Sequence, residues 1–271
     1  MVVQHNMSAL NANRQLGITT GKLSKSTEKL SSGYQINRAA DDAAGLAISE
    51  KMRSQIRGLN KASNNAQDGI SLVQTAEGAL NETTSILQRM NELATQAAND
   101  TNTTTDREAL QLEVNQLASE VDRIATTTQF NTMNLLDGTY QGKKLEVGAV
   151  AQQTITVSIL DTKATTLGVD SLTLTNQSDA ESAMTAAQTA IETVSTRRAT
   201  LGAIQNRLEH TVDNLDNISE NTQSSESRIR DTDMAAEMVQ YSATSIIQQA
   251  GQSMLAQANS QTQGILSLLQ G

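Results

Sequence analysis

Residues 183–218 read AMTAAQTAIETVSTRRATLGAIQNRLEHTVDNLDNI and carry the strongest structural signal of the chain. At alternating steps of four and three residues, the segment presents Ala183, Ala187, Ala190, Val194, Arg197, Leu201, Ile204, Leu208, Thr211, Leu215 and Ile218. Only Arg197 and Thr211 interrupt this apolar stripe, which is typical of a long helix that buries one seam against other helices. Ser178 and Glu181 predict a capping box at its start. Because its other faces are polar, the helix needs partners elsewhere in the chain.

Two other segments repeat the same spacing and are the predicted partners. A helix capped by Asp41 or Asp42 is expected to run to Ala98. Its stripe consists of Leu59, Ala62, Ala66, Gly69, Val73, Ala76, Leu80, Thr83, Leu87, Met90, Ala94 and Ala97. Thr105 and Glu108 predict a capping box for the next helix, whose stripe is Leu110, Val114, Leu117, Val121 and Ile124. Three such seams predict a mainly α protein built as a long antiparallel helical bundle or coiled coil.

The middle of the chain, residues 129–177, has a different character. Polar and apolar residues alternate along 154–159 and again along 172–174, and four glycines interrupt the region. Alternation of this kind is typical of strands, and glycine is typical of turns. A small β-hairpin region is therefore predicted around 138–177, covering one end of the bundle.

Both ends of the chain are predicted to form amphipathic helices, over 3–31 with Gly33 as the C-cap, and over 232–269. Residues 219–233 are polar and suggest a mixture of helix and linker. The terminal helices carry thin apolar faces, which we expect to be completed by other copies of the chain. The predicted polymerisation residues are Val3, Leu10, Leu16, Leu23, Leu30, Met234, Met238, Tyr241, Ile247, Met254, Leu255, Ile265, Leu268 and Leu269.

Composition argues against several classes of protein. The chain lacks cysteine, proline and tryptophan and has one phenylalanine and three tyrosines, which favours thin helical layers over a thick core. A net charge of −9 argues against binding to nucleic acid or to anionic membranes. No apolar run is long enough for membrane insertion, and the first residues do not resemble a Sec-type signal peptide.

The sequence offers few candidate residues for catalysis, cofactor binding or metal binding. No phosphate-binding loop, nucleophile elbow or zinc signature is present, so we expect no enzyme activity and no cofactor. Glu209, His210 and Asp213 could place metal ligands on one helix face, although a solvated face is the simpler interpretation. Asp41 and Asp42 are interpreted as a helix cap rather than as paired catalytic carboxylates.

Four stretches carry a specific resemblance to a known family. They are LSSGYQINRAADDAAGLAIS at 30–49, QDGISLVQTAEGAL at 67–80, LGAIQNRLEHT at 201–211 and SRIRDTDMA at 227–235. The first two resemble the N-terminal signature of bacterial flagellin, and the last two resemble its C-terminal signature. The resemblance extends over nearly the whole chain apart from about 140–180.

This resemblance implies a subunit that self-assembles into the extracellular flagellar filament for motility. It implies an inner coiled-coil domain from 1–42 with 231–271, a rod domain from 43–230, and no variable outer domains. It also implies type III export without a cleaved signal peptide. The implied partners are an export chaperone bound by the C-terminal helix, hook-associated and cap proteins, and an animal Toll-like receptor.

The receptor expectation rests on QRMNELA at 88–94, which resembles the face that the Toll-like receptor for flagellin recognises. The positions carried over are Gln88, Arg89, Glu92, Leu93 and Glu113; the alternative for them is an ordinary solvated helix face. Two other functions stay open at this point. One is the hook–filament junction protein, and the other is a soluble receptor-binding module that acts as a monomer.

Overall fold

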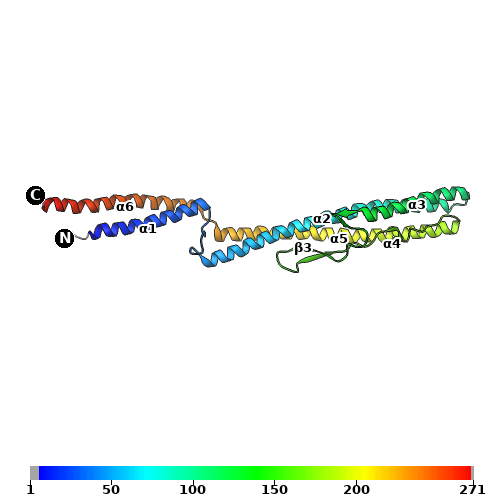
Figure 1. Ribbon diagram of the computed structural model, residues 1–271, viewed down its shortest axis with the longest axis horizontal. Coiled ribbons are helices and arrows are strands. Elements are labelled where there is room, and N and C mark those ends of the chain that lie inside the picture. The colour runs from blue at the N-terminus through cyan, green and yellow to red at the C-terminus, as the bar shows by residue number, and fades with distance from the viewer. Residues whose placement is uncertain (1–5, 270–271) are drawn as a thin grey trace. The chain divides into compact units, whose positions relative to one another are not determined.

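The computed structural model describes residues 6–269, with side chains described up to Gln261 (Figure 1). Its helices are α1 (Met7–Ser32), α2 (Ala43–Ala97), α3 (Thr104–Thr127), α4 (Ala164–Leu167), α5 (Gln177–Arg230) and α6 (Met234–Leu269). Its strands are β1 (Gln129–Phe130), β2 (Met133–Asn134), β3 (Lys143–Glu146) and β4 (Thr154–Val157). The chain divides into two compact units, one formed by 1–54 with 221–271 and the other by 55–220. The predicted mainly α architecture with small hairpins is confirmed.

The unit formed by 55–220 has its core along the predicted stripes. All twelve stripe positions of α2, from Leu59 to Ala97, are buried. On α5 the stripe is half-buried at Arg197, Ile204 and Thr211 and exposed at Ile218, and it is buried at its other positions, Ala183, Ala187, Ala190, Val194, Leu201, Leu208 and Leu215. Val114 and Val121 of α3 join the same core, so the three predicted seams meet. The heptad spacing therefore predicted both the helices and the faces that they bury.

The N-terminal caps differ in part from the predictions. Asp42 caps α2 as expected, because its Oδ1 accepts hydrogen bonds from the N–H groups of Ala44 and Gly45. The capping box of α3, however, is formed by Thr103 and Asp106, so the predicted pair Thr105 and Glu108 was wrong. Thr103 has an extended backbone with ψ 167°, and its side chain already satisfies the N–H of Asp106.

The start of α5 was also placed too late by the sequence. The predicted capping box of Ser178 and Glu181 was wrong, because α5 begins at Gln177. Asn176 Oδ1 accepts the N–H of Asp179 at 2.8 Å and so caps the first turn. An asparagine one residue before the helix satisfies an N–H group that has no partner within the helix.

The predicted mixture of helix and linker over 219–233 is confirmed, because residues 231–233 connect α5 to α6 and α5 itself continues through residues 219–230. The stretch contains neither proline nor glycine, so nothing in its backbone ends the helix. Ser219 is buried and its Oγ donates to Asn60 Oδ1 at 2.8 Å, which ties this part of α5 to α2. Arg228 and Arg230 lie in the last turn, where positive charges stabilise the helix because its dipole is negative at that end.

The strands form two antiparallel hairpins, β1–β2 and β3–β4. The predicted strand at 154–159 is present as β4, but the one at 172–174 was wrong. There the backbone bonds to a side chain: Gln111 Nε2 donates to Leu172 O, and Gln111 Oε1 accepts from Leu174 N, both at 2.7 Å. Because one amide group satisfies both backbone positions, the segment needs no partner strand.

The β3–β4 hairpin lies along the sides of α2 and α5, which corrects the expectation that it covers one end of the bundle. Leu145 of β3 packs with Ala66 and Leu208 in a small apolar cluster. A Cβ atom at Gly69 would lie 2.5 Å from Leu145 Cδ1, so the absence of a side chain at Gly69 lets the hairpin approach α2. Asn65 Nδ2 donates to Glu146 O at 3.1 Å and fixes the register of this contact.

We predict that Leu87→Ala lowers the free energy of unfolding by about 2–5 kcal/mol, because Leu87 is fully buried and its loss leaves a cavity. Denaturant unfolding of the unassembled chain measures the effect. The matched control is Leu112→Ala on α3, where the side chain is 68% exposed and the expected change is within about 0.5 kcal/mol. Equal losses in the two variants would contradict the assignment of the core.

Candidate functional site

Helices α1 and α6 pair side by side within one unit and form the first candidate site (Figure 1). Asn6 Nδ2 donates to Ala258 O at 2.9 Å, and Gln248 Nε2 donates to Thr20 Oγ1 at 3.3 Å, so the helices run antiparallel. The residues buried between them include Thr19, Ser26 and Thr244, which are small and polar. Thr19 and Thr244 each donate to the carbonyl four residues earlier, so burial leaves their hydroxyls satisfied.

The predicted polymerisation residues fall into two groups on this pair. Leu16, Leu23, Leu30, Tyr241 and Leu255 are half-buried, which is the burial expected of residues that help hold the pair together. Leu10, Met234, Met238, Ile247 and Met254 are exposed to solvent. Val3 lies outside the described residues, and the side chains of Ile265, Leu268 and Leu269 on α6 also lie outside the described range. The apolar surface of the pair therefore comes from the second group.

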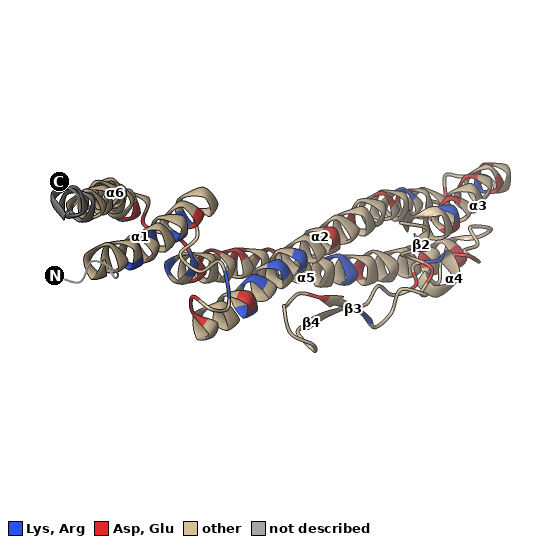
Figure 2. Ribbon diagram, turned by 60° about the vertical axis from the view of Figure 1, so that its left-hand side comes forward, with Lys and Arg blue, Asp and Glu red and all other residues tan. Residues whose placement is uncertain are grey.

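Sequence reasoning missed three residues of this surface, because Ile18, Val239 and Ile246 are also exposed and lie off the apolar stripe that the prediction followed. Met7 lies on the apolar face of the predicted helix 3–31 and is exposed as well, although it was not among the predicted polymerisation residues. A simpler signal was available in the charge pattern, because Glu237 is the single charged residue among the 36 of α6. Figure 2 shows this contrast, with the coloured part of α6 almost entirely tan while blue and red recur along α2 and α5.

One arginine, which the sequence analysis did not single out, links the segment that follows α1 to the segment that precedes α6. Gly33 ends α1 in the left-handed conformation at φ 75°, as predicted for a C-cap. Tyr34 and Asp231 form an isolated antiparallel bridge, and Gln35 N donates to Arg230 O at 2.7 Å. The Arg230 guanidinium lies 4.7 Å from the centroid of the Tyr34 ring and donates to Glu50 at 3.0 Å.

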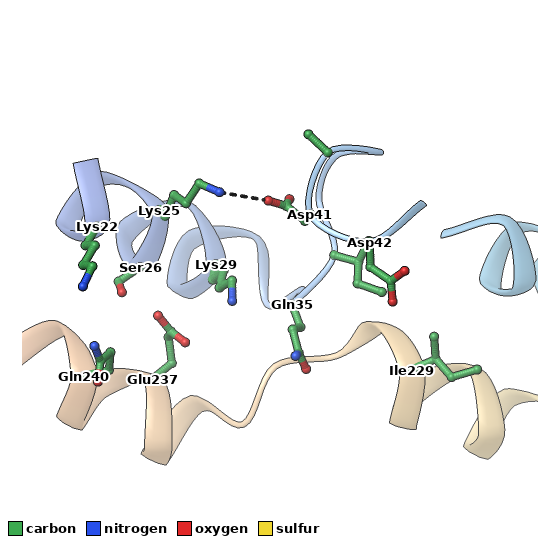
Figure 3. Close-up of a pocket in the computed structure, with 12 residues that line it drawn as sticks. Lys22, Lys25, Ser26, Lys29, Gln35, Asp41, Asp42, Ile229, Glu237 and Gln240 are labelled. Atoms are coloured by element: carbon green, nitrogen blue, oxygen red, sulfur yellow. Dashed lines mark hydrogen bonds and ion pairs between the residues drawn. The ribbon is translucent and has the colours of Figure 1, made fainter. Parts of the chain in front are cut away.

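A hollow of about 440 Å³ lies beside these connections (Figure 3). Lys22, Ser26 and Lys29 of α1 face Glu237 and Gln240 of α6 across it. Lys25 of α1 also lines the hollow, and its Nζ lies 3.4 Å from Asp41 Oδ1. The backbone N–H of Arg38 donates to Asp41 and lowers the pKa of that carboxyl, with Lys25 adding to the effect. The hollow thus mixes cations and anions and shows no preference for one sign of ligand.

The second candidate site is the predicted receptor-facing surface on α2 and α3. Arg89 Nε donates to Glu113 Oε1 at 2.9 Å, and Arg89 Nη1 donates to Glu92 Oε2 at 3.1 Å. The hydrogen bond to Glu113 raises the pKa of Arg89, so the guanidinium stays charged. Gln88, Arg89, Glu92 and Glu113 are exposed, whereas Leu93 is 1% exposed and belongs to the core. The accessible part of this face is therefore polar and charged.

Within residues 6–269, no three His, Cys, Asp or Glu side chains come together as ligands of one ion. Glu209, the first member of the possible ligand group, accepts a hydrogen bond from Gln205 Nε2 at 2.9 Å. None of the described helices combines the length and apolarity needed to span a bilayer.

Comparisons with known proteins agree with this architecture. The model of the bacterial flagellin N-terminal helical region matches residues 3–141, and that of the C-terminal helical region matches residues 184–269. A flagellin of Halalkalibacterium halodurans is 54% identical over 99% of this chain and 100% of its own length. The flagellar filament 31.3 kDa core protein of Treponema maltophilum is 49% identical over the full length of both chains.

A solved structure supports the same conclusion. The crystal structure of Bacillus cereus flagellin is 37% identical and matches with a TM-score of 0.52, covering 56% of this chain and 88% of that one. The family models together match both long helical regions of the chain. The chain therefore belongs to the bacterial flagellin family and is a structural protein of the flagellar filament rather than an enzyme.

Proposed function

We propose that copies of this chain polymerise through the outward faces of α1 and α6. The observation that carries the proposal is the exposed apolar surface on these helices, which includes Leu10, Ile247 and Met254. Surfaces of this kind are rare on proteins that stay monomeric. Each such side chain stabilises association by about 1.5–3 kcal/mol when it is fully buried.

The kind of contact between copies decides whether a filament results. We propose that the outward face of the α1–α6 pair makes a head-to-tail contact, because such a contact repeats without closing and builds a helical array. In this proposal residues 1–42 with 231–271 form an inner coiled-coil domain and residues 43–230 form a rod domain. Residues 128–176 form the two hairpins, α4 and their connections in place of variable outer domains.

The same surface suggests how the chain is handled before assembly. An uncovered helix with a single charge is prone to aggregate, so we propose that an export chaperone covers α6 until the chain leaves the cell. We further propose type III export without a cleaved signal peptide, and contacts with hook-associated and cap proteins at the ends of the filament.

Two alternatives differ from this proposal in measurable ways. A hook–filament junction protein is needed in few copies, whereas a filament subunit is abundant, so copy number per cell separates them. The full-length similarity to a filament core protein favours the abundant subunit. A monomeric binding module would stay in the supernatant when the purified chain is sedimented with filament seeds.

We also propose that Gln88, Arg89, Glu92 and Glu113 form a face that an animal Toll-like receptor recognises. The supporting observation is the charged cluster in which Arg89 joins two carboxylates from α2 and α3 on an exposed surface. Leu93 lies beneath this face in the core and acts by supporting the position of α2. The arginine is the expected centre of the interaction, because arginines are frequent among residues that dominate binding.

For assembly, we predict that Ile247→Gln slows seeded filament growth at least about tenfold, because an amide replaces an apolar side chain in the contact. Sedimentation and electron microscopy of seeded samples measure growth. Ile247 is 55% exposed, so the unfolding of the unassembled chain is expected to stay unchanged. Leu112→Gln is the matched control and should assemble normally. Growth of Ile247→Gln at the control rate would contradict the proposed contact.

For receptor recognition, we predict that Arg89→Ala lowers the potency of the monomer in receptor-expressing cells by about tenfold, since a central arginine is removed. Dose–response curves of receptor signalling measure the change. Arg123→Ala is the matched control, because Arg123 is also an exposed arginine paired with a glutamate three residues away, Glu120. Equal potency of the two variants would argue for an ordinary solvated face.

A further inference from the structure

Methionine is concentrated on the exposed faces of α1 and α6. Met7 is 70% exposed on α1, and Met234, Met238 and Met254 are 47%, 50% and 64% exposed on α6. Elsewhere in the described chain, Met90 is fully buried, Met52 and Met184 are half-buried, and Met133 alone is exposed. The exposed thioethers therefore gather on the two helices that carry the apolar assembly surface.

We propose that Met7, Met234, Met238 and Met254 are oxidation sites whose conversion to methionine sulfoxide blocks assembly of the free chain. The proposal rests on the proposed assembly through α1 and α6. The reactant is a peroxide such as hydrogen peroxide. A sulfur lone pair attacks one peroxide oxygen, the O–O bond breaks and an S–O bond forms. The sulfur loses two electrons, and the second oxygen leaves as water with both protons.

The structure favours these four sulfur atoms over those in the core. Oxidation requires the peroxide to reach the thioether, and the side chains of the four residues are open to solvent. Met90 shares the core of the other unit with Leu87 and Leu93, where the surrounding side chains exclude the reagent. Within an assembled filament the four residues would be covered by neighbouring copies, so the free chain is the sensitive form.

Oxidation is expected to block assembly because it makes the methionine side chain polar. A thioether is a flexible apolar group that fits an irregular contact, whereas a sulfoxide is a strong hydrogen-bond acceptor that must lose its water on burial. Met234 and Met238 are four residues apart and share one face of α6, so oxidation of both changes one continuous patch. Met254 lies seven residues after Ile247 and shares the face of that residue, which the assembly proposal uses.

The monomer itself is expected to keep its fold after oxidation. The α1–α6 pair is held by half-buried residues such as Leu16, Leu23 and Tyr241, together with the hydrogen bonds from Asn6 and Gln248. The four exposed sulfur atoms stay in water after oxidation, so no polar group is buried within the chain. Loss of assembly without loss of helix is therefore the signature that separates this effect from simple damage.

The experiment treats the purified, unassembled full-length chain with hydrogen peroxide and then adds filament seeds. Peptide mass spectrometry reads the sulfoxide at each methionine, circular dichroism reads the helix, and sedimentation reads growth. We expect oxidation at the four sites before Met90, unchanged helix, and seeded growth slowed at least about tenfold. Treatment with methionine sulfoxide reductases A and B and a reductant should restore growth, because together they reduce both epimers.

The quadruple variant M7L, M234L, M238L and M254L keeps the volume and apolarity of the surface and should assemble whether or not it is treated with peroxide. M133L is the matched control and should stay as sensitive as the unchanged chain, because Met133 is exposed outside α1 and α6. Growth of the oxidised chain at the untreated rate would overturn the proposal, as would equal loss of growth in the treated quadruple variant.

These outcomes are distinct from failure of the assembly proposal. If Ile247→Gln grew normally, the assembly surface itself would be misplaced, whatever the effect of peroxide. If Ile247→Gln failed to grow while the oxidised chain grew normally, the surface would stand and the oxidation proposal would fall. If the quadruple variant grows poorly even without peroxide, reductase treatment of the oxidised unchanged chain still tests the proposal. Recovery of growth then supports it, and no recovery contradicts it.

Discussion

The apolar seam shared by α2 and α5 is the contact on which the unit formed by 55–220 depends. Fully buried leucines and valines such as Leu80, Leu87 and Val194 occupy it at heptad spacing, and alanines between them let the helices approach closely. Long helices whose other faces are polar have little stability alone, so this shared burial is what keeps them helical. Helix α3 and the two hairpins pack on the helices that this seam joins. The exposed charged face on α2 and α3 depends on the same packing.

Polar side chains attach the irregular segments to this seam, in a chain that has few aromatic residues for the purpose. Gln111 binds both backbone positions at 172 and 174, and Asp122 Oδ1 accepts the N–H of Ala164 at 2.7 Å, at the start of α4. Arg197, which interrupts the stripe of α5, donates to the carbonyl of Asp161. Burial lowers the pKa of Arg197, and the nearby Asp161 acts in the opposite direction. Arg197 thus breaks the apolar stripe of α5 at a point where that helix is bonded to the hairpin region.

The two units differ in the kind of side chain that they bury. The unit of 55–220 buries many large apolar side chains in its core, whereas the α1–α6 pair buries small polar residues such as Thr19 and Thr244 and leaves Met7, Ile247 and Met254 exposed. The first arrangement suits a part that is stable in a single chain. The second suits a part whose apolar surface is covered by other molecules, as expected of a filament protein. The same distribution places the oxidisable methionines where association would cover them.

Local repeats in the sequence were sufficient to identify the long helices and the faces that they bury, because helix periodicity follows directly from residue spacing. The sequence also limited the cap of α2 to Asp41 or Asp42, and the structure selects Asp42. The repeats also identified the terminal helices and many of their apolar residues. Contacts between distant residues decided the rest. Gln111 turned a predicted strand at 172–174 into an irregular segment, and Thr103 and Asn176 moved two helix starts. Packing separated the buried Leu93 from the exposed Arg89, and half-buried Leu16 from exposed Ile18. A spacing rule places residues on a face, but the area that each one exposes is set by the partner that covers it, and that partner lies far away in the chain.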